Sequence, residues 1–232
     1  MNIESVLPKE EVAPRSSDPG SAPYIRSYVF MRRVVGRLAF ILPPLIVFGE
    51  PLVFDDRPFP LGSLSAYYYS GFREIFVGLL WAIGVFLVLY KWPERTRESR
   101  VSTYAGLAVI VVALFPTGKP GAKVATTPLQ DLLGEEWVER VHFGAAGIFI
   151  FLLSRISRYW ARHRRDRKQL HKVCEWVIVA ALALAILEGV FDWPDYGILV
   201  AEFAAVWAFA ISWLATVERD PRPSARASGA AT

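Results

Sequence analysis

The stretch from Ile75 to Tyr90 contains no charged residue, and it constrains the fold more than any other feature of the chain. It follows the adjacent pair Arg73 and Glu74, and it ends at Lys91. With its flanking residues, this apolar run has the length of about 20 residues that a helix needs to cross a bilayer. We therefore interpret it as a membrane span with two charged residues at its mouth.

Five further stretches have a similar character. The six predicted spans cover residues 34–54, 70–90, 101–117, 137–159, 173–191 and 196–216. A hydrophobic content of 53% and a mean hydropathy of +0.32 also argue against a soluble domain. The sequence thus predicts an all-α, polytopic bundle of six transmembrane helices over residues 34–216. We expect a flexible N-terminal tail at 1–33 and a disordered C-terminal tail at 217–232.

Lysine and arginine are distributed unevenly between the two sides of these spans. Residues 1–33, 91–100, 155–172 and 217–232 hold twenty of them, whereas the alternate connections hold three. The positive-inside rule places the richer side in the cytoplasm. Both tails are therefore predicted to be cytoplasmic, the N-in/C-in topology.

Ionisable residues recur near the extracytoplasmic ends of five predicted spans. At a rise of about 1.5 Å per residue, they lie roughly 5–9 Å below the outer boundary. They are Glu50, Glu74, His142, Glu188 and Glu202. Groups at such depths usually face the bundle or a wet cavity, which favours a polar pocket open to the outside. The alternative is that each group snorkels or pairs at the interface and only holds helices together.

We select as candidate ligand-binding residues those that this layer and its neighbouring turn contain. They are Glu50, Ser65, Tyr69, Arg73, Glu74, Glu139, His142, Glu188 and Glu202. An arginine fork beside tyrosines suits a phosphate or carboxylate headgroup. We expect Arg73 to pair with a glutamate of another helix.

A metal site is the less favoured interpretation of the same layer. Glu139 and His142 share a helix face at i, i+3, a spacing found among metal ligands in helix bundles. His142, Glu74 and Glu202 are the set that could hold a divalent cation. A lone histidine is more often hydrogen-bonded structure or a proton carrier, so we expect no cofactor. The single cysteine excludes an intrachain disulfide.

The predicted cytoplasmic stretch at 155–172 is strongly basic. We expect it to contact anionic lipid headgroups, although fixing the topology is a sufficient role. The expected contact residues are Arg158, Arg162, Arg164, Arg165, Arg167 and Lys168. No motif supports nucleic-acid binding. A membrane-protein partner or a homo-oligomer stays open.

Three local patterns give further expectations. Pro43 and Pro44 should bend the first span and free backbone carbonyls. Thr127 should cap a surface helix that begins at Pro128 and runs into span four. Small faces, with Gly78 on span two and Gly144 and Gly147 on span four, are expected to allow close helix approach.

Several segments together resemble a group of uncharacterised bacterial integral membrane proteins with six helices. The matching segments are Ser65-Ala66-Tyr67-Tyr68, Arg73-Glu74, Phe76-Val77-Gly78, residues 113–117, Val141-His142-Phe143 and residues 211–214. The resemblance implies architecture only, in a bacterial cytoplasmic (inner) membrane.

A more distant similarity is to ceramidase-like membrane hydrolases. Those proteins have a Ser-x-x-x-His segment on an early span, where this chain has Ser65-x-x-x-Tyr69. The later histidine pair of that family is missing, and six spans are predicted here rather than seven.

Three functional hypotheses follow. The first is a receptor or transport-related protein that binds a small ligand, ion or lipid headgroup in the outer pocket. The second is a membrane-embedded lipid hydrolase or transferase that uses His142 and carboxylates. The third is a structural membrane subunit or anchor. The sequence does not decide whether the protein is an enzyme.

Overall fold

The computed structural model describes residues 22–54, 59–90, 97–119, 121, 124–191 and 196–217. Within these residues the chain is all-α, as predicted. The helices are α1 (Ala22–Val53), α2 (Arg73–Leu89), α3 (Arg97–Leu114), α4 (Pro128–Leu133), α5 (Glu135–His163), α6 (Lys168–Phe191) and α7 (Gly197–Val217), with a short 3-10 helix, η3 (Ser65–Tyr69). The first helix begins at Ala22, so part of the expected N-terminal tail is helical. Residues 1–21 and the tail from 218 lie outside the described residues.

Four described helices are long and apolar enough to cross a membrane. They are Val29–Val53 of α1 together with α5, α6 and α7. Helix α2 has 17 residues, and the apolar part of α3 is the shorter segment Ser99–Leu114. The structure therefore supports a multi-pass helical membrane protein, with four of the six expected spans meeting both criteria of length and composition.

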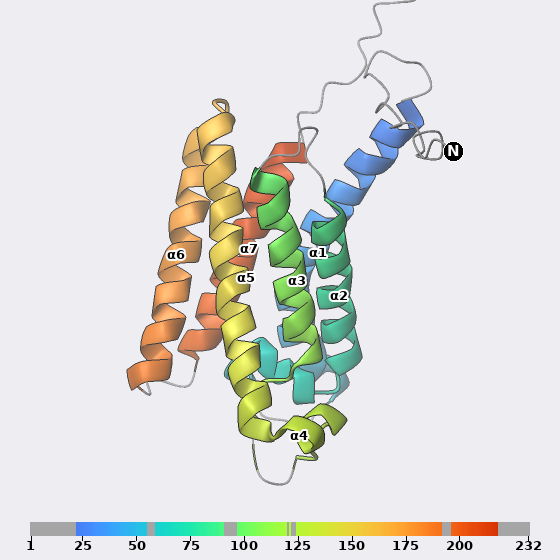
Figure 1. Ribbon diagram of the computed structural model, residues 1–232, viewed down its shortest axis with the longest axis vertical. Helices are drawn as coiled ribbons and strands as arrows, with labels where there is room; N and C mark the ends of the chain where they lie inside the picture. The colour runs from blue at the N-terminus through green and yellow to red at the C-terminus, as the bar shows by residue number, and fades with distance from the viewer. Residues whose placement is uncertain are drawn as a thin grey trace, which may run out of the picture.

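The six long helices form a closed ring that follows the chain order. Helix α1 packs against α2, α2 against α3, α3 against α5, α5 against α6, and α6 against α7, which returns to α1. Helix α4 lies across the end of the bundle where α5 begins (Figure 1). The same view shows α5 and α6 close together near their connection and farther apart toward α4.

The prolines of α1 leave a carbonyl that another helix uses. In a regular helix the Phe40 carbonyl would accept a hydrogen bond from the backbone of residue 44, but Pro44 has no N–H. The indole Nε1 of Trp207 on α7 donates to the Phe40 oxygen at 2.9 Å, and the two rings stack with centroids 5.0 Å apart. The freed carbonyl thus becomes a contact between the first and last helices.

The segment 59–72, which we call the outer loop, enters the mouth of the ring between α1 and α2. Its Leu64 and Tyr67 side chains are buried and belong to the core cluster of the outer half, together with Ile46 and Val109. The Leu199 amide of α7 donates to the Gly62 carbonyl at 3.0 Å. The loop therefore closes one side of the bundle mouth with apolar side chains.

Close helix approach occurs at different glycines from those expected. A Cβ on Gly106 of α3 would lie 2.5 Å from the Gly84 carbonyl oxygen of α2, whereas nothing lies within 4 Å of one on Gly78, Gly144 or Gly147. The prediction that these three glycines mediate close packing is therefore wrong. Glycine admits a neighbouring backbone only where a second helix crosses at that position.

The expected cap at Thr127 is confirmed. Its side chain accepts from the Gln130 amide at 3.3 Å, the Gln130 side chain returns to the Thr127 amide, and Pro128 occupies the first turn. The helix does not continue into α5, because Gly134 interrupts it with a φ of 88°. This left-handed conformation suits glycine and turns the chain into the bundle.

Candidate functional site

The carboxylates of the predicted polar layer do not all converge on one site. Glu202 of α7 accepts from the Leu64 amide at 2.5 Å and from the Ser65 hydroxyl at 3.0 Å. Glu50 of α1 accepts from the Gly71 amide at 3.2 Å. Two buried or half-buried carboxylates from different helices thus bind the outer loop, one near its middle and one near its end.

Arg73 has an aromatic neighbour rather than a glutamate. Its Nη2 donates to the Tyr68 hydroxyl at 3.0 Å, and its guanidinium carbon lies 4.5 Å from the centroid of that ring. Both Arg73 and Glu74 are exposed at the start of α2. Among the described ion pairs, none joins Arg73 to the carboxylates that we expected as its partners.

Tyr69 and Glu139 belong to a separate cluster beneath α4. The Tyr69 hydroxyl donates to the Thr117 carbonyl and accepts from Gln130 Nε2, both at 2.8 Å. The carboxylate of Glu139 lies against Gly118, in space that a side chain there would occupy. Burial raises the pKa of Tyr69, and the Gln130 bond opposes this. The cluster fastens α4 and the α3–α4 connection to the outer loop.

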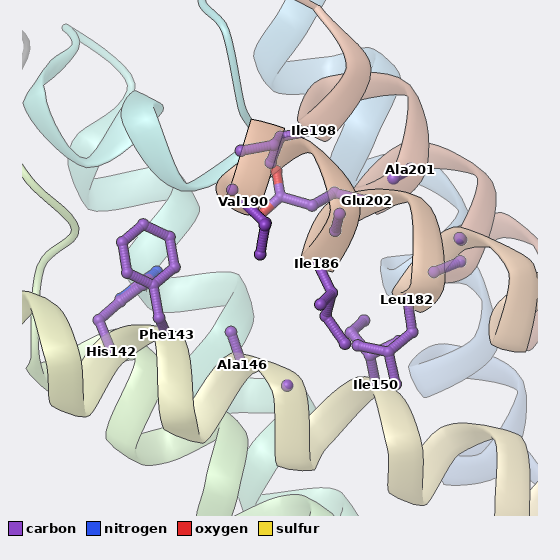
Figure 2. Close-up of a pocket in the computed structure, with 15 residues that line it drawn as sticks. His142, Phe143, Ala146, Ile150, Leu182, Ile186, Val190, Ile198, Ala201 and Glu202 are labelled. Carbon is purple, nitrogen blue, oxygen red and sulfur yellow. The ribbon is translucent and has the colours of Figure 1, made fainter. Parts of the chain in front are cut away.

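A cavity of about 420 Å³ lies between α5, α6 and α7. Figure 2 shows Glu202 reaching between Val190 and Ile198, with His142 and Phe143 on the opposite helix. Two of its lining residues are ionisable and the others are apolar: His142, Phe143, Ala146, Gly147, Ile150, Ala181, Leu182, Ala185, Ile186, Gly189, Val190, Ile198, Ala201, Glu202 and Ala205.

The cavity opens sideways, between α5 and α6. Its lining residues Phe143, Ile186 and Val190 are 51%, 58% and 68% exposed, although all three are large and apolar. Ala201 and Ala205 of α7 are almost fully buried at its back. In a membrane, this exposed rim would face hydrocarbon.

His142 lines this cavity but is bonded elsewhere. Its Nδ1 lies 2.6 Å from the Phe115 carbonyl oxygen near the end of α3, and the ring is 1% exposed. In the described part of the chain, no three His, Cys, Asp or Glu side chains are grouped as metal ligands would be. The set His142, Glu74 and Glu202 therefore does not form a metal centre in this arrangement.

The basic stretch surrounds the connection between α5 and α6. Arg158 is bound to the buried Glu175 of α6 in a short ion pair. The other candidate lipid contacts are exposed or half-exposed, namely Arg162, Arg164, Arg165, Arg167 and Lys168. Whether they contact anionic lipid stays a prediction.

The apolar lining escaped the sequence reasoning, which followed ionisable residues. A usable signal was present, because Ala181, Ala185 and Gly189 recur every four residues and so form one small-residue face of α6. On α5, Ala146 and Gly147 give the facing positions. Small residues on both sides of a helix pair leave space when the backbones do not approach.

The fold and the cavity together define a class: a multi-pass helical membrane protein with an apolar cavity that opens laterally. Comparisons with known protein families, with curated proteins and with solved structures give no match to this chain. The resemblance to bacterial six-helix proteins therefore stays a prediction, and the function rests on the cavity itself.

Proposed function

We propose that this protein is a membrane receptor or carrier that binds a small, mainly apolar molecule in the cavity between α5, α6 and α7. The observation that carries the proposal is the cavity itself, whose volume of about 420 Å³ lies in the range of small-molecule sites. Such sites are typically apolar with a few placed polar groups, and here Glu202 and His142 are those groups.

The proposed ligand enters from the lipid. The exposed side chains of Phe143, Ile186 and Val190 lie at the open side of the cavity. The outer loop, by contrast, covers the neighbouring mouth of the helix ring. A molecule dissolved in the bilayer can therefore reach Glu202 without crossing the aqueous phase. A strictly water-soluble ligand would have to pass these apolar residues.

The topology in this proposal has six spans with both tails in the cytoplasm of a bacterium. The twenty-to-three distribution of lysine and arginine supports it. Helices α2 and α3 also present large apolar side chains to the outside, among them Trp81 and Val85 on α2 and Leu107 on α3. These surfaces would suit lipid, so both helices are included as spans, and the cavity lies in the extracytoplasmic half.

The test uses a substitution that fills the cavity with a large side chain without disturbing the packing of the helices. Gly147 lines the cavity and Gly144 does not, and nothing lies within 4 Å of a Cβ at either position. Gly147→Phe and Gly144→Phe are therefore matched variants. Purified protein in lipid nanodiscs would be labelled with a diazirine derivative of dodecanol, and the labelled peptides would be identified by mass spectrometry.

We expect the wild type and Gly144→Phe to be labelled at the buried α7 positions Ala201 and Ala205, and an excess of dodecanol to suppress this labelling. Gly147→Phe should reduce it by about tenfold, equivalent to about 1.4 kcal/mol of binding. Equal α7 labelling in both variants, or none in the wild type, would contradict the proposed function.

A further inference from the structure

The polar groups that line the cavity restrict which hydrogen-bonding groups a ligand can carry there. Among its lining residues only Glu202 and His142 are ionisable, and the Nδ1 of His142 already faces the Phe115 carbonyl. Glu202 is therefore the main group available to a ligand. Because both Glu202 oxygens act as acceptors in their contacts with the outer loop, the matching group on the ligand is a donor.

Glu202 can accept further hydrogen bonds in addition to those from the outer loop. Its Oε2 accepts from the Leu64 amide and its Oε1 from the Ser65 hydroxyl, and a carboxylate offers about four lone-pair sites. These two donors are neutral, so they fix the orientation of the carboxyl group and supply no positive charge to it. In the part of the chain that the structure describes, no lysine or arginine forms an ion pair with Glu202.

A second carboxylate, that of Glu188 on α6, lies near the start of α7 but is not among the lining residues of the cavity. The Glu188 carboxylate lies against Gly197, five residues before Glu202 on α7, so a charge on Glu188 would act on Glu202. The Glu188 side chain is 8% exposed, and its Oε2 has no hydrogen-bond partner among the described residues. A buried carboxylate without a cation tends to become protonated, so a cation supplied by the ligand would stabilise the ionised form of Glu202.

We propose that the ligand is a cationic amphiphile, a molecule with a hydrocarbon body and a protonated amine that binds Glu202 under the influence of Glu188. This inference rests on the proposed function, since it names the ligand class of the same cavity. The body would lie along the apolar walls of α5 and α6. A fatty acid would bring a further carboxyl group beside Glu202, and a neutral alcohol would supply no positive charge to it.

Three probes of equal chain length test the headgroup: dodecylamine, dodecanol and dodecanoate. Each competes with the diazirine label for the α7 positions, in nanodiscs of neutral phosphatidylcholine at pH 7. We expect dodecylamine to displace the label at a concentration about tenfold or more below that of dodecanol, with dodecanoate the weakest. The preference for amine over alcohol is the quantity to compare among variants.

Glu202→Gln should abolish the preference, because the amide keeps an acceptor for the outer loop but has no charge. Glu50→Gln is the matched control, since Glu50 is also buried and binds the loop but does not line the cavity. It should retain the preference. Glu188→Gln should reduce it in part, which gives a second route if Glu202→Gln does not fold.

The failures of the two proposals are distinguishable. If the amine displaces the label no better than dodecanol from the wild type, the inference about the ligand is overturned while the cavity remains a binding site. If Glu50→Gln removes the preference as strongly as Glu202→Gln, the inference is again overturned. If no probe displaces the α7 label, both proposals fail.

Discussion

Two helix pairs in this bundle both contain glycines, and they use them in opposite ways. Between α2 and α3, Gly84 and Gly106 let the backbones approach, and the Ser102 hydroxyl donates to the Leu87 carbonyl at 2.8 Å. Between α5 and α6, Gly147 and Gly189 meet nothing within 4 Å and line the cavity. The comparison shows that a glycine marks either a tight seam or a vacant space, depending on where its partner helix lies.

The difference lies in how α5 and α6 diverge from the end where they are connected (Figure 1). There, α5 and α6 are held together by the Arg158–Glu175 pair and by the buried Trp160 beside His171, with ring centroids 5.8 Å apart. This end of the pair is therefore fixed, and the two helices lie farther apart toward α4 (Figure 1). Further along, the small residues of α5 and α6 are too short to fill the gap, and the cavity results.

The largest expected effect is at the tight seam. Gly106→Ala would place a Cβ 2.5 Å from the Gly84 carbonyl oxygen and 2.7 Å from the Val88 amide nitrogen. Because these are backbone atoms, we expect the free energy of unfolding to fall by about 3 kcal/mol. Steric trapping in bicelles measures it, with Gly78→Ala as the control in open space on α2. Similar losses in both variants would remove the distinction between the seam and the exposed glycine.

The next largest effect tests which interaction holds α5 and α6 together at their connected end. Arg158→Met would leave the buried Glu175 without its cation, so we expect the free energy of unfolding to fall by about 2 kcal/mol. This is less than for a fully buried pair, because Arg158 is partly exposed. The double variant Arg158→Met/Glu175→Met should recover more than half of this loss, because no buried charge remains. The same unfolding measurement applies. No recovery in the double variant would indicate that packing, rather than charge, supports this end.

A smaller effect on stability should distinguish Gly189, near the end of α6, from Gly197, at the start of α7. Gly197→Ala would bring a Cβ to 2.8 Å from the carboxylate carbon of Glu188, whereas Gly189→Ala enters open space. We expect the first to lower the free energy of unfolding by about 1 kcal/mol and the second to leave it equal or slightly higher. Thermal unfolding of the two variants, side by side in one detergent, gives the ranking. The reverse order would contradict the placement of Glu188.

The smallest effect is a gain. Gly144→Ala and Gly147→Ala replace helical glycines that meet no neighbour, so each should stabilise the protein by about 0.5–1 kcal/mol through helix propensity. Thermal unfolding again measures the change. A loss at either position would mean that α5 approaches another helix more closely in the membrane.

Much of the fold was predictable because helices follow local patterns. Apolar runs located the long helices, and the cap at Thr127 located α4. The end of α4 at Gly134 was missed, since Leu132, Leu133 and Trp137 continue the apolar pattern across it.

The candidate site was predictable only in part. Depth along the helices selected Glu202 and His142, and these two residues line the same cavity. It could not show that Glu50 and Glu202 bind the outer loop, because the path of a loop has no periodicity to read. It also could not predict the partner of Arg73, whose guanidinium donates to the hydroxyl of Tyr68, five residues earlier in the chain.

The contact between Trp207 and the Phe40 carbonyl has an evolutionary consequence. The acceptor is available because Pro44 has no N–H, so the indole replaces a hydrogen bond that the helix itself lacks. A relative with another residue at position 44 would restore the helical bond and lose the need for an indole at 207. These two positions, far apart in the chain, should therefore change together among related sequences.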